Sequence, residues 1–391
     1  MNPRDVVITG IGLVSSLGEG AEAHWQAFSA PALPPVIDDA SYPPYTLHKL
    51  PEIDWGLQIP KRGDQRQMET WQRLGVYAAG MALDDSGIKG DAALCATMDM
   101  IVAASGGERD ELVDTSILEA SRARNDIEVL LNEKLTTDLR PTLFLAQLSN
   151  LMAGNISIVH NVTGSSRTFM GEETSGVLAV ETATARLRAG TSTHVLVGGA
   201  FQTEHPDMLL GYELGGYLQR GGWQPLWQRT NDGGGVVSGS GAAFLVLETR
   251  EHAEARGRTA YATIESVRSS RTRRDDGTLA DGIASLVEAL GAPAGELLVI
   301  SGASGAHQAT AAEHAGLAGH AVRGISALIG HVKEAEFPFT VALAALAIAR
   351  KAALPPLDAA SEKPFSGTPE AVLATAVGYH RGEGAALLRG A

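Results

Sequence analysis

The sequence of 391 residues contains a single cysteine, Cys95. One thiol excludes an internal disulfide and any zinc site built from several cysteines. The sequence also lacks an apolar run of the roughly 20 residues that a transmembrane helix needs, and Met1 to Asp5 lead directly into an apolar strand pattern without the features of a signal peptide. We therefore expect a cytoplasmic protein with no membrane partner and no metal.

Charged residues are scarce and unbalanced. They make up 19% of the chain, and acidic residues exceed basic ones, giving a net charge of −14. An acidic chain of this kind is repelled by phosphate backbones and anionic lipid surfaces, so we expect no nucleic-acid partner. Hydrophobic residues account for 44% of the chain and glycines number 45. This composition is typical of a globular protein with a large core and many tight turns.

A dinucleotide site is also absent. Gly10 and Gly12 follow an apolar strand and begin the pattern of a nucleotide-binding turn. The third glycine of that pattern is missing, and no acidic residue closes a second strand about 20 residues further on. The two glycines therefore indicate a tight turn between a strand and a helix, and we expect no cofactor.

Buried strands alternate with helices along the chain, which is typical of an α/β protein whose sheets are covered on both faces. The sequence predicts strands at 6–14, 98–104, 195–200, 242–248, 261–267, 297–300, 372–377 and 385–389, and helices at 22–28, 70–86, 141–154, 177–187, 282–290 and 341–353. We predict irregular chain at 31–64, a sharply turning glycine-rich loop at 233–241 and a loop at 326–331. The second half repeats the order of the first, which indicates a duplicated core.

The segment 164–176 has the frame of a nucleophile loop without a nucleophile. An apolar segment, Ile156–Val159, precedes it and is expected to be a strand, and a long helical pattern follows it. Enzymes place a reactive thiolate at such a helix N-terminus because the helix dipole lowers the thiol pKa. Here the position carries Glu173. A carboxylate suits the dipole but is a poor nucleophile toward a thioester.

These features resemble the β-ketoacyl synthase family of the thiolase superfamily. The resemblance extends over nearly the whole chain, and the segments that carry it are 6–18, 176–200, 225–248 and 329–331. It implies a thiolase-like five-layered α/β/α/β/α sandwich of two duplicated halves, residues 1–248 and 249–391. Members of the family condense acyl thioesters with a cysteine, two histidines and a supporting lysine.

Three of these four positions are replaced in this sequence. The position of the family's cysteine falls on Glu173, that of the first histidine on Ser304, and that of the lysine on Ser326. The second histidine is retained as His331. His307 and Lys333 lie close to the replaced positions, but their offsets in the sequence do not fit the motifs.

The C-terminal glycine motif of the family is reduced to Gly378-Tyr379-His380-Arg381, and Tyr379 stands where the family has a phenylalanine that gates the acyl chain. The resemblance also implies a tunnel for that chain. Leu145 and Leu148, in the predicted helix 141–154, are our candidates for its lining.

This pattern of replacements is similar to that of chain length factors, the β subunits of ketosynthase pairs. The resemblance implies a non-condensing subunit that forms a heterodimer with an active ketosynthase through the strand near 165–170. It would shape the acyl tunnel in a type II polyketide, aryl polyene or fatty-acid-like pathway. Acyl carrier protein would dock mainly on the active partner.

Two alternatives remain open from the sequence. The chain could act as a malonyl-carrier decarboxylase or an atypical acyltransferase that uses His331 and Glu173. A charged Glu173 would repel a malonyl carboxylate in a low-dielectric pocket, so decarboxylation would need a buried, protonated carboxyl. The chain could also be a homodimeric scaffold without a role toward acyl chains.

Overall fold

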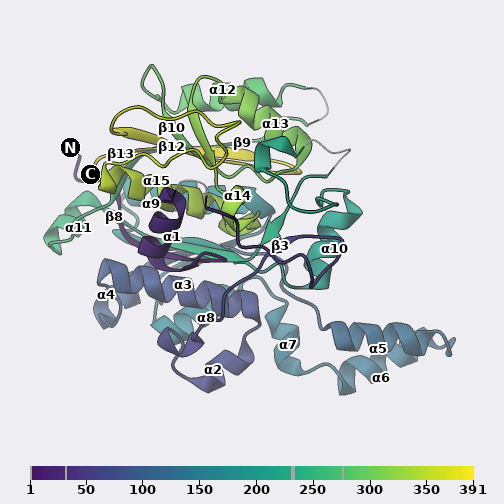
Figure 1. Ribbon diagram of the computed structural model, residues 1–391. Helices are drawn as coiled ribbons and strands as arrows, with labels where there is room; N and C mark the ends of the chain where they lie inside the picture. The colour runs from purple at the N-terminus through teal and green to yellow at the C-terminus, as the bar shows by residue number, and fades with distance from the viewer. Residues whose placement is uncertain (1, 31–32, 230–233, 275–276) are drawn as a thin grey trace.

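Two sets of five strands run through the molecule in the same spatial order (Figure 1). The computed structural model describes residues 2–30, 33–229, 234–274 and 277–391. The first set consists of β1 (Val6–Ser15), β4 (Asp99–Ala103), β5 (Ser166–Phe169), β6 (His194–Phe201) and β8 (Gly241–Thr249), in the order β5-β4-β6-β8-β1. The second consists of β9 (Ala262–Ser270), β10 (Leu298–Ser301), β11 (Ala321–Gly324), β12 (Ala371–Val377) and β13 (Glu383–Arg389), in the order β11-β10-β12-β13-β9.

The strand directions repeat as well. Counted along the chain, the first strand of each set (β1 or β9) is antiparallel to the fifth (β8 or β13). The fifth is antiparallel to the fourth (β6 or β12), and the remaining neighbouring pairs are parallel. Residues 6–8 of β1 also pair with residues 262–264 of β9, so the two sets join along one edge. This repetition confirms the predicted α/β architecture of two duplicated halves.

The helices form three layers around the two sets of strands (Figure 1). The outer layer on the first set contains α3 (Thr70–Ser86), α4 (Ala92–Thr97) and α8 (Leu151–His160), and the outer layer on the second contains α12 (Leu279–Ala289) and α13 (His307–Gly316). The middle layer contains α9 (Glu172–Ala189) and α15 (Glu336–Arg350). Smaller elements connect these layers: β2 (Gly18–Glu19), α1 (Gly20–Ser29), β3 (Leu47–His48), α2 (Arg62–Gln67), α10 (Pro206–Leu214), β7 (Ser238–Gly239), α11 (Arg250–Ala255), α14 (Ser326–Ile329) and the 3-10 turns η1 (Trp55–Leu57), η2 (Leu226–Gln228) and η3 (Lys333–Ala335).

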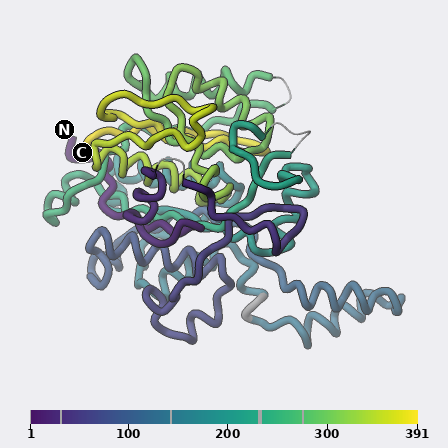
Figure 2. The backbone as a smooth tube through the Cα atoms, in the orientation of Figure 1, coloured from purple at the N-terminus to yellow at the C-terminus, as the bar shows by residue number. Residues whose placement is uncertain are grey.

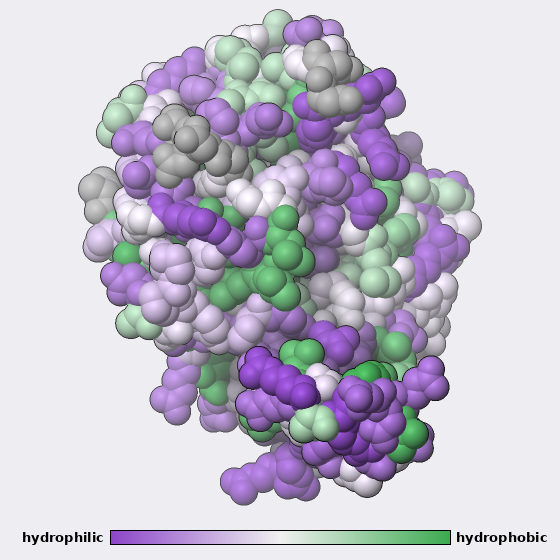
Figure 3. Space-filling model, turned by 90° about the vertical axis from the view of Figure 1, so that its right-hand side faces the viewer, coloured by the Kyte–Doolittle hydropathy of each residue, from purple (hydrophilic) through white to green (hydrophobic). Residues whose placement is uncertain are grey.

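A helical hairpin extends away from this body. It is formed by α5 (Glu111–Ser121) and α6 (Ile127–Thr137), and α7 (Pro141–Ala146) leads back from it. The tube in Figure 2 shows the hairpin projecting on its own beyond the layers. Figure 3, which views the molecule toward the tip of the hairpin, shows hydrophobic side chains between its charged ones.

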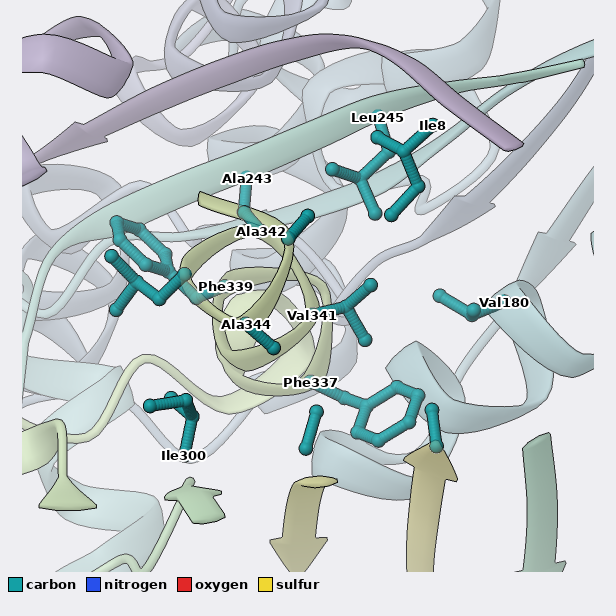
Figure 4. Close-up of a cluster of buried hydrophobic side chains, with 14 of the residues drawn as sticks. Ile8, Val180, Ala243, Leu245, Ile300, Phe337, Phe339, Val341, Ala342 and Ala344 are labelled. Carbon is teal, nitrogen blue, oxygen red and sulfur yellow. The ribbon is translucent and has the colours of Figure 1, made fainter. Parts of the chain in front are cut away.

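The middle helix α15 packs against both sets of strands because it is apolar around its whole circumference. Its residues 337–348 are all buried. Figure 4 shows Phe337, Val341 and Ala342 of this helix between Leu245 on one side and Ile300 on the other. One core cluster thus contains side chains from both halves.

Several predicted elements have different boundaries in the structure. Residues 156–159 belong to helix α8, so the prediction of a strand there is wrong, and the strand that precedes the Glu173 turn is β5. Short apolar runs occur in buried strands and buried helices alike, and the ten-residue length of α8 decides in favour of a helix. The predicted helix 141–154 is two helices, α7 and α8, interrupted at 147–150.

Two further predictions need adjustment. The predicted loop 326–331 begins with the four-residue helix α14. Helix α15 begins at Glu336, five residues earlier than predicted. It ends at Arg350, three residues before the predicted end, where Lys351 adopts a left-handed conformation. Of the predicted irregular segment 31–64 and the glycine-rich loop 233–241, residues 31–32 and 233 lie outside the described residues. No helix in the described ranges is long and apolar enough to cross a membrane.

Candidate active site

Glu173 lies at the buried N-terminus of α9, directly after strand β5. The turn between them ends at Gly171 with φ 131°, and Glu172, the first residue of α9, has φ 53°. The first of these conformations is open essentially to glycine alone. The turn directs the Glu173 side chain into the protein, where the residue is 1% exposed. The structure thus forms the strand–turn–helix frame that the sequence indicated, with a carboxylate at its helical end.

The Glu173 carboxylate is held by the retained histidine. Its Oε1 lies 2.7 Å from His331 Nε2 and accepts a hydrogen bond from the backbone N–H of Tyr379 at 3.1 Å. Both ends of the Glu173–His331 pair are buried. A buried pair of this kind is held in one geometry because separating the two groups would leave each without a partner.

His331 is fixed from its other side by a tyrosine. Its Nδ1 lies 2.8 Å from the hydroxyl oxygen of Tyr212 in α10, and burial raises the pKa of Tyr212 well above its usual value. The backbone N–H of His331 donates to the carbonyl of Val237 in the glycine-rich segment. Glu173, His331 and Tyr212 therefore form a continuous buried chain of polar groups. The sequence does not single out Tyr212. It lies 119 positions before His331, and no local pattern links the two residues.

Tyr379 lies in the turn between β12 and β13 and covers this chain of groups. Its ring centroid is 5.3 Å from that of Tyr212 and 5.8 Å from that of His331. Its hydroxyl donates to Glu172 Oε1 at 3.2 Å, and burial raises its pKa strongly. The structure therefore brings Tyr379 into the site, and its role toward an acyl chain stays a prediction.

The two serines at the other replaced positions are buried and hydrogen-bonded. Ser304 follows β10, and its Oγ accepts a hydrogen bond from the backbone N–H of Ala306 at 3.2 Å. Ser326 begins α14 and donates to Glu336 Oε1 at 3.0 Å. The Ser304 bond is of the local kind that short hydroxyl side chains commonly form with the backbone, whereas Ser326 reaches the carboxyl of the next helix, α15. They supply neither the imidazole nor the ammonium group that a condensing site would place there.

A group of buried carboxyls surrounds Glu173. Burial raises the pKa of Glu313 and of Glu334 to about 7, and that of Glu336 well above its usual value. The charge of Glu173 adds to the shift of all three. Sequence reasoning missed these residues, because nothing in the pattern distinguishes a buried glutamate from the exposed ones on a helix.

A cavity of about 640 Å³ opens beside the pair. Its wall contains Glu172, Lys333 and Glu334 on the side of the site, with Met170 and Arg381 further out. Glu173 and His331 are not part of this wall. The carboxylate–imidazole pair thus lies behind the cavity surface rather than on it.

The two leucines predicted to line a tunnel lie on the surface of this chain. Leu145, near the end of α7, is 47% exposed, and Leu148, in the break after it, is 39% exposed. Gln147, between them, is the residue of this segment that lines the cavity. A tunnel role for the two leucines therefore stays a prediction and depends on a second chain that covers them.

Of the remaining residues considered from the sequence, Cys95 and His307 lie away from the Glu173–His331 pair, and Lys333 lies near it. Cys95 is a buried thiol in α4 that donates to the carbonyl of Ile88 and belongs to the core around α3. His307 is exposed at the start of α13. The Lys333 ammonium lies 4.2 Å from the centroid of the Tyr212 ring, closer to the site than its sequence offset indicated.

The arrangement favours a structural carboxylate over a nucleophile. Covalent acyl transfer to an enzyme needs an activated sulfur, oxygen or nitrogen that the thioester can reach. The position that the turn presents carries a buried carboxylate paired with an imidazole, and the one thiol of the chain lies in an outer helix.

Comparisons with known proteins agree with the fold. Residues 45–253 match the model of the N-terminal domain of β-ketoacyl synthases. The 3-oxoacyl-[acyl-carrier-protein] synthase 2 of Vibrio cholerae is 26% identical over 273 residues, and the match covers 68% of this chain and 62% of the relative. The chain therefore matches about three fifths of the length of such curated relatives.

A ketosynthase β subunit and two solved structures are also similar. The ketoacyl synthase β subunit of the tetracenomycin polyketide synthase of Streptomyces glaucescens is 26% identical, over 65% of this chain and 60% of that protein. A β-ketoacyl synthase from Burkholderia phymatum superposes with a TM-score of 0.79 and the ishigamide ketosynthase/chain length factor with 0.78; each is 21% identical, and each match covers 99% of both chains. The chain belongs to the β-ketoacyl synthase family.

Proposed function

We propose that this chain is the non-condensing, chain-length-factor type subunit of a ketosynthase pair. It would bind an active ketosynthase and shape the acyl tunnel of the pair. The observation that carries the proposal is the burial of Glu173 against His331 at the end of the turn where a condensing enzyme needs a thiolate. A carboxylate there stabilises the helix terminus but forms no thioester.

The rest of the site supports a non-condensing role. Ser304 and Ser326 stand at the positions where the resemblance places a histidine and a lysine. The Ser304 hydroxyl accepts from the nearby Ala306 N–H, and the Ser326 hydroxyl donates to the buried Glu336 of α15. Three of the four residues that would act on an acyl thioester are therefore replaced by groups without that chemistry. The retained His331 is engaged by Glu173 and Tyr212.

Two surface features support a partner of the same fold. Strand β5 is the last strand of its sheet, so one of its edges has no neighbour within the described chain, and such an edge can extend a second sheet. The hairpin of α5 and α6 exposes Leu112 (83%) and Leu118 (67%). Exposed apolar side chains gathered on a projecting element mark interaction surfaces.

The relatives suggest the setting of this partnership. One similar protein is a ketoacyl synthase β subunit, one similar structure is a ketosynthase/chain length factor, and another is a ketosynthase in complex with its acyl carrier protein. We infer that this chain acts with an active ketosynthase and an acyl carrier protein in a type II polyketide, aryl polyene or fatty-acid-like pathway. The carrier protein would dock mainly on the active partner.

Co-expression tests the proposal. The chain would be produced with each ketosynthase encoded near its gene, and the complexes would be analysed by size-exclusion chromatography and native mass spectrometry. We expect a stable 1:1 complex with a ketosynthase that carries an intact cysteine and two histidines. A chain that forms only homodimers in the presence of every such ketosynthase would contradict the proposal and favour a scaffold.

Assays of the purified chain alone test the two enzymatic alternatives, acyl transfer and decarboxylation. Purified alone, the chain is expected to form no covalent adduct with an acyl-carrier thioester and to leave malonyl-carrier protein intact. Decarboxylation that is lost in Glu173→Ala and retained in Glu288→Ala, an exposed position on α12, would establish the chain as a decarboxylase instead.

A further inference from the structure

The cavity beside the site has a mixed and strongly charged wall. Three cationic side chains line it, Arg109, Lys333 and Arg381, together with three carboxyls, Glu172, Asp207 and Glu334. In a protein with a net charge of −14, a cavity wall with as many cations as carboxyls is a local departure from the overall charge.

Only one of these cations lacks a carboxylate partner within the described residues. Arg109 makes two hydrogen bonds to Asp114, at 2.6 and 2.9 Å. Arg381 lies 3.8 Å from Glu172. Within the described residues, the ammonium of Lys333 has no ion pair or side-chain hydrogen bond, and its contacts are with aromatic rings.

Lys333 is held in place by aromatic rings rather than by acceptors. Its ammonium lies 4.2 Å from the ring centroid of Tyr212, 5.1 Å from that of Phe201 and 6.0 Å from that of Tyr379. Cation–π contacts position an ammonium group but leave its N–H donors without acceptors. The backbone of Lys333 adopts φ 40°, a conformation uncommon for a residue with a side chain. Backbone and rings together therefore fix a cation in the cavity wall.

A second polar group without a partner lies directly beside it. Glu334 is 3% exposed, and its Oε2 is buried and accepts no hydrogen bond in the described structure. Burial raises its pKa to about 7, so a neutral carboxyl is available near neutral pH. A neutral carboxyl donates one hydrogen bond, which a carboxylate oxygen accepts. The adjacent ammonium and carboxyl thus offer complementary donors to the same kind of ligand.

We propose that this cavity binds a carboxylate group, with Lys333 as the charged donor and Glu334 as the second contact. The carboxylate would belong to a ligand that terminates in an acid, such as an acyl chain with a free carboxyl end. The site lies in this chain alone, and the inference depends on the proposed function only for the identity of the chain that carries the carboxylate.

Titration of the purified full chain with glutarate and with glutaramide tests this inference. The two probes have similar size, and only glutarate carries carboxylates. We expect glutarate to bind at least tenfold more tightly than glutaramide by isothermal titration calorimetry. Equal binding of the two probes, or no binding of glutarate, would overturn the inference.

Variants locate the binding in the cavity. Lys333→Met keeps an unbranched side chain against the aromatic rings but removes the charge, and it is expected to weaken glutarate binding about tenfold or more. Lys351→Met is the matched control, since Lys351 also has a positive φ (52°) but lies at the end of α15 and not in the cavity wall. Glu334→Gln keeps a neutral hydrogen-bonding group and is expected to bind glutarate at least as tightly as the unmodified chain. Unchanged affinity in Lys333→Met, or equal losses in both lysine variants, would contradict the assignment.

The same variants separate this inference from the proposed function. Lys333→Met is expected to copurify with the active ketosynthase as the unmodified chain does, because the exposed surface of the hairpin is unchanged. A chain that assembles with a ketosynthase but binds no glutarate would refute the carboxylate site and leave the subunit role intact. A chain that binds glutarate but assembles with no ketosynthase would refute the subunit role and leave the carboxylate site intact.

Discussion

Glu173 and His331 meet because two glycine turns bring distant segments together. Gly171, at φ 131°, ends the turn before α9, and Gly330, at φ 71°, ends α14 just before the histidine. A Cβ at Gly330 would lie 2.8 Å from the backbone of Gly239, so the close approach of the two segments also requires glycine there. The pair is thus fixed by backbone conformation as much as by the contact between its two side chains.

Removing the carboxylate of this pair should destabilise the fold. Glu173→Ala leaves the buried His331 Nε2 without its partner, and breaking one side of a buried pair costs about 3 kcal/mol or more. Glu173→Gln keeps an acceptor for the Tyr379 N–H and should cost less. Urea unfolding measures both. Glu288→Ala, at an exposed position of α12, is the control and should change the free energy of unfolding by about 0.5 kcal/mol or less.

Glu313 should make the stability depend on pH. Its pKa is about 7 in the folded protein, where it accepts hydrogen bonds from Ser301 and Thr375, against 4.5 for an ordinary glutamate. The folded state therefore binds the proton more tightly, and the contribution of Glu313 to stability is complete below about pH 4.5 and is lost as the pH rises through 7.

Glu313→Gln removes this dependence. The free energy of unfolding of the variant, relative to that of the unmodified chain, should rise by about 2 to 3 kcal/mol between pH 5 and pH 8. Urea unfolding at the two pH values measures the difference. A relative stability that stays constant or falls over this range would show that the Glu313 carboxyl is not protonated in the folded protein.

At the scale of elements, substitutions on the projecting hairpin are expected to weaken binding to the partner without changing the stability of the chain. Leu112 and Leu118 are 83% and 67% exposed on α5, so Leu→Ser changes there remove little buried surface. The double variant Leu112→Ser/Leu118→Ser should keep its melting temperature within about 2 °C, because exposed substitutions rarely change stability by more than 0.5 kcal/mol. Its copurification with an active ketosynthase should fall at least tenfold.

A leucine elsewhere on the surface provides the control for this variant. Leu57 in η1 is 65% exposed, and Leu57→Ser should leave both melting temperature and copurification unchanged. If the double variant copurifies as well as Leu57→Ser does, the hairpin is not part of the contact with the partner.

Elements with a clear periodicity could be predicted from the sequence, and elements whose boundaries depend on packing could not. The prediction of a helix at 70–86 is confirmed residue for residue, because apolar spacing marks one face and Gly87, at φ 68°, ends the helix. Residues 156–159 were assigned to a strand because a four-residue apolar run fits either structure. The start of α15 was missed because Glu336, an acidic residue, is fully buried in its first turn.

The candidate site shows the same division. Sequence motifs located Glu173 and His331, and the structure places them 2.7 Å apart. Tyr212 and Glu334 were not found, because a residue that acts through a neighbour from another segment leaves no local pattern. Those contacts depend on how α10 and η3 pack against α9, which the sequence of each element does not specify.

At the scale of the whole molecule, the two halves share one core. The cluster around α15 contains Leu245 of β8 and Ile300 of β10, and β1 pairs directly with β9. Neither set of strands can unfold alone without cost, because its opening would expose to water the apolar α15 surface that it covers. The duplicated halves are therefore expected to unfold as one cooperative unit.

Phe339→Ala tests this coupling. Phe339 is fully buried in α15 and contacts His24 of α1 edge-on, with ring centroids 5.3 Å apart. Its truncation should cost about 3 to 5 kcal/mol, from lost apolar contact and the cavity left behind. Hydrogen exchange followed by mass spectrometry should show amides of β6 in the first half and of β12 in the second losing protection by the same free energy. A loss confined to one of these strands would mean that the halves unfold separately and that the pairing of β1 with β9 is too weak to couple them.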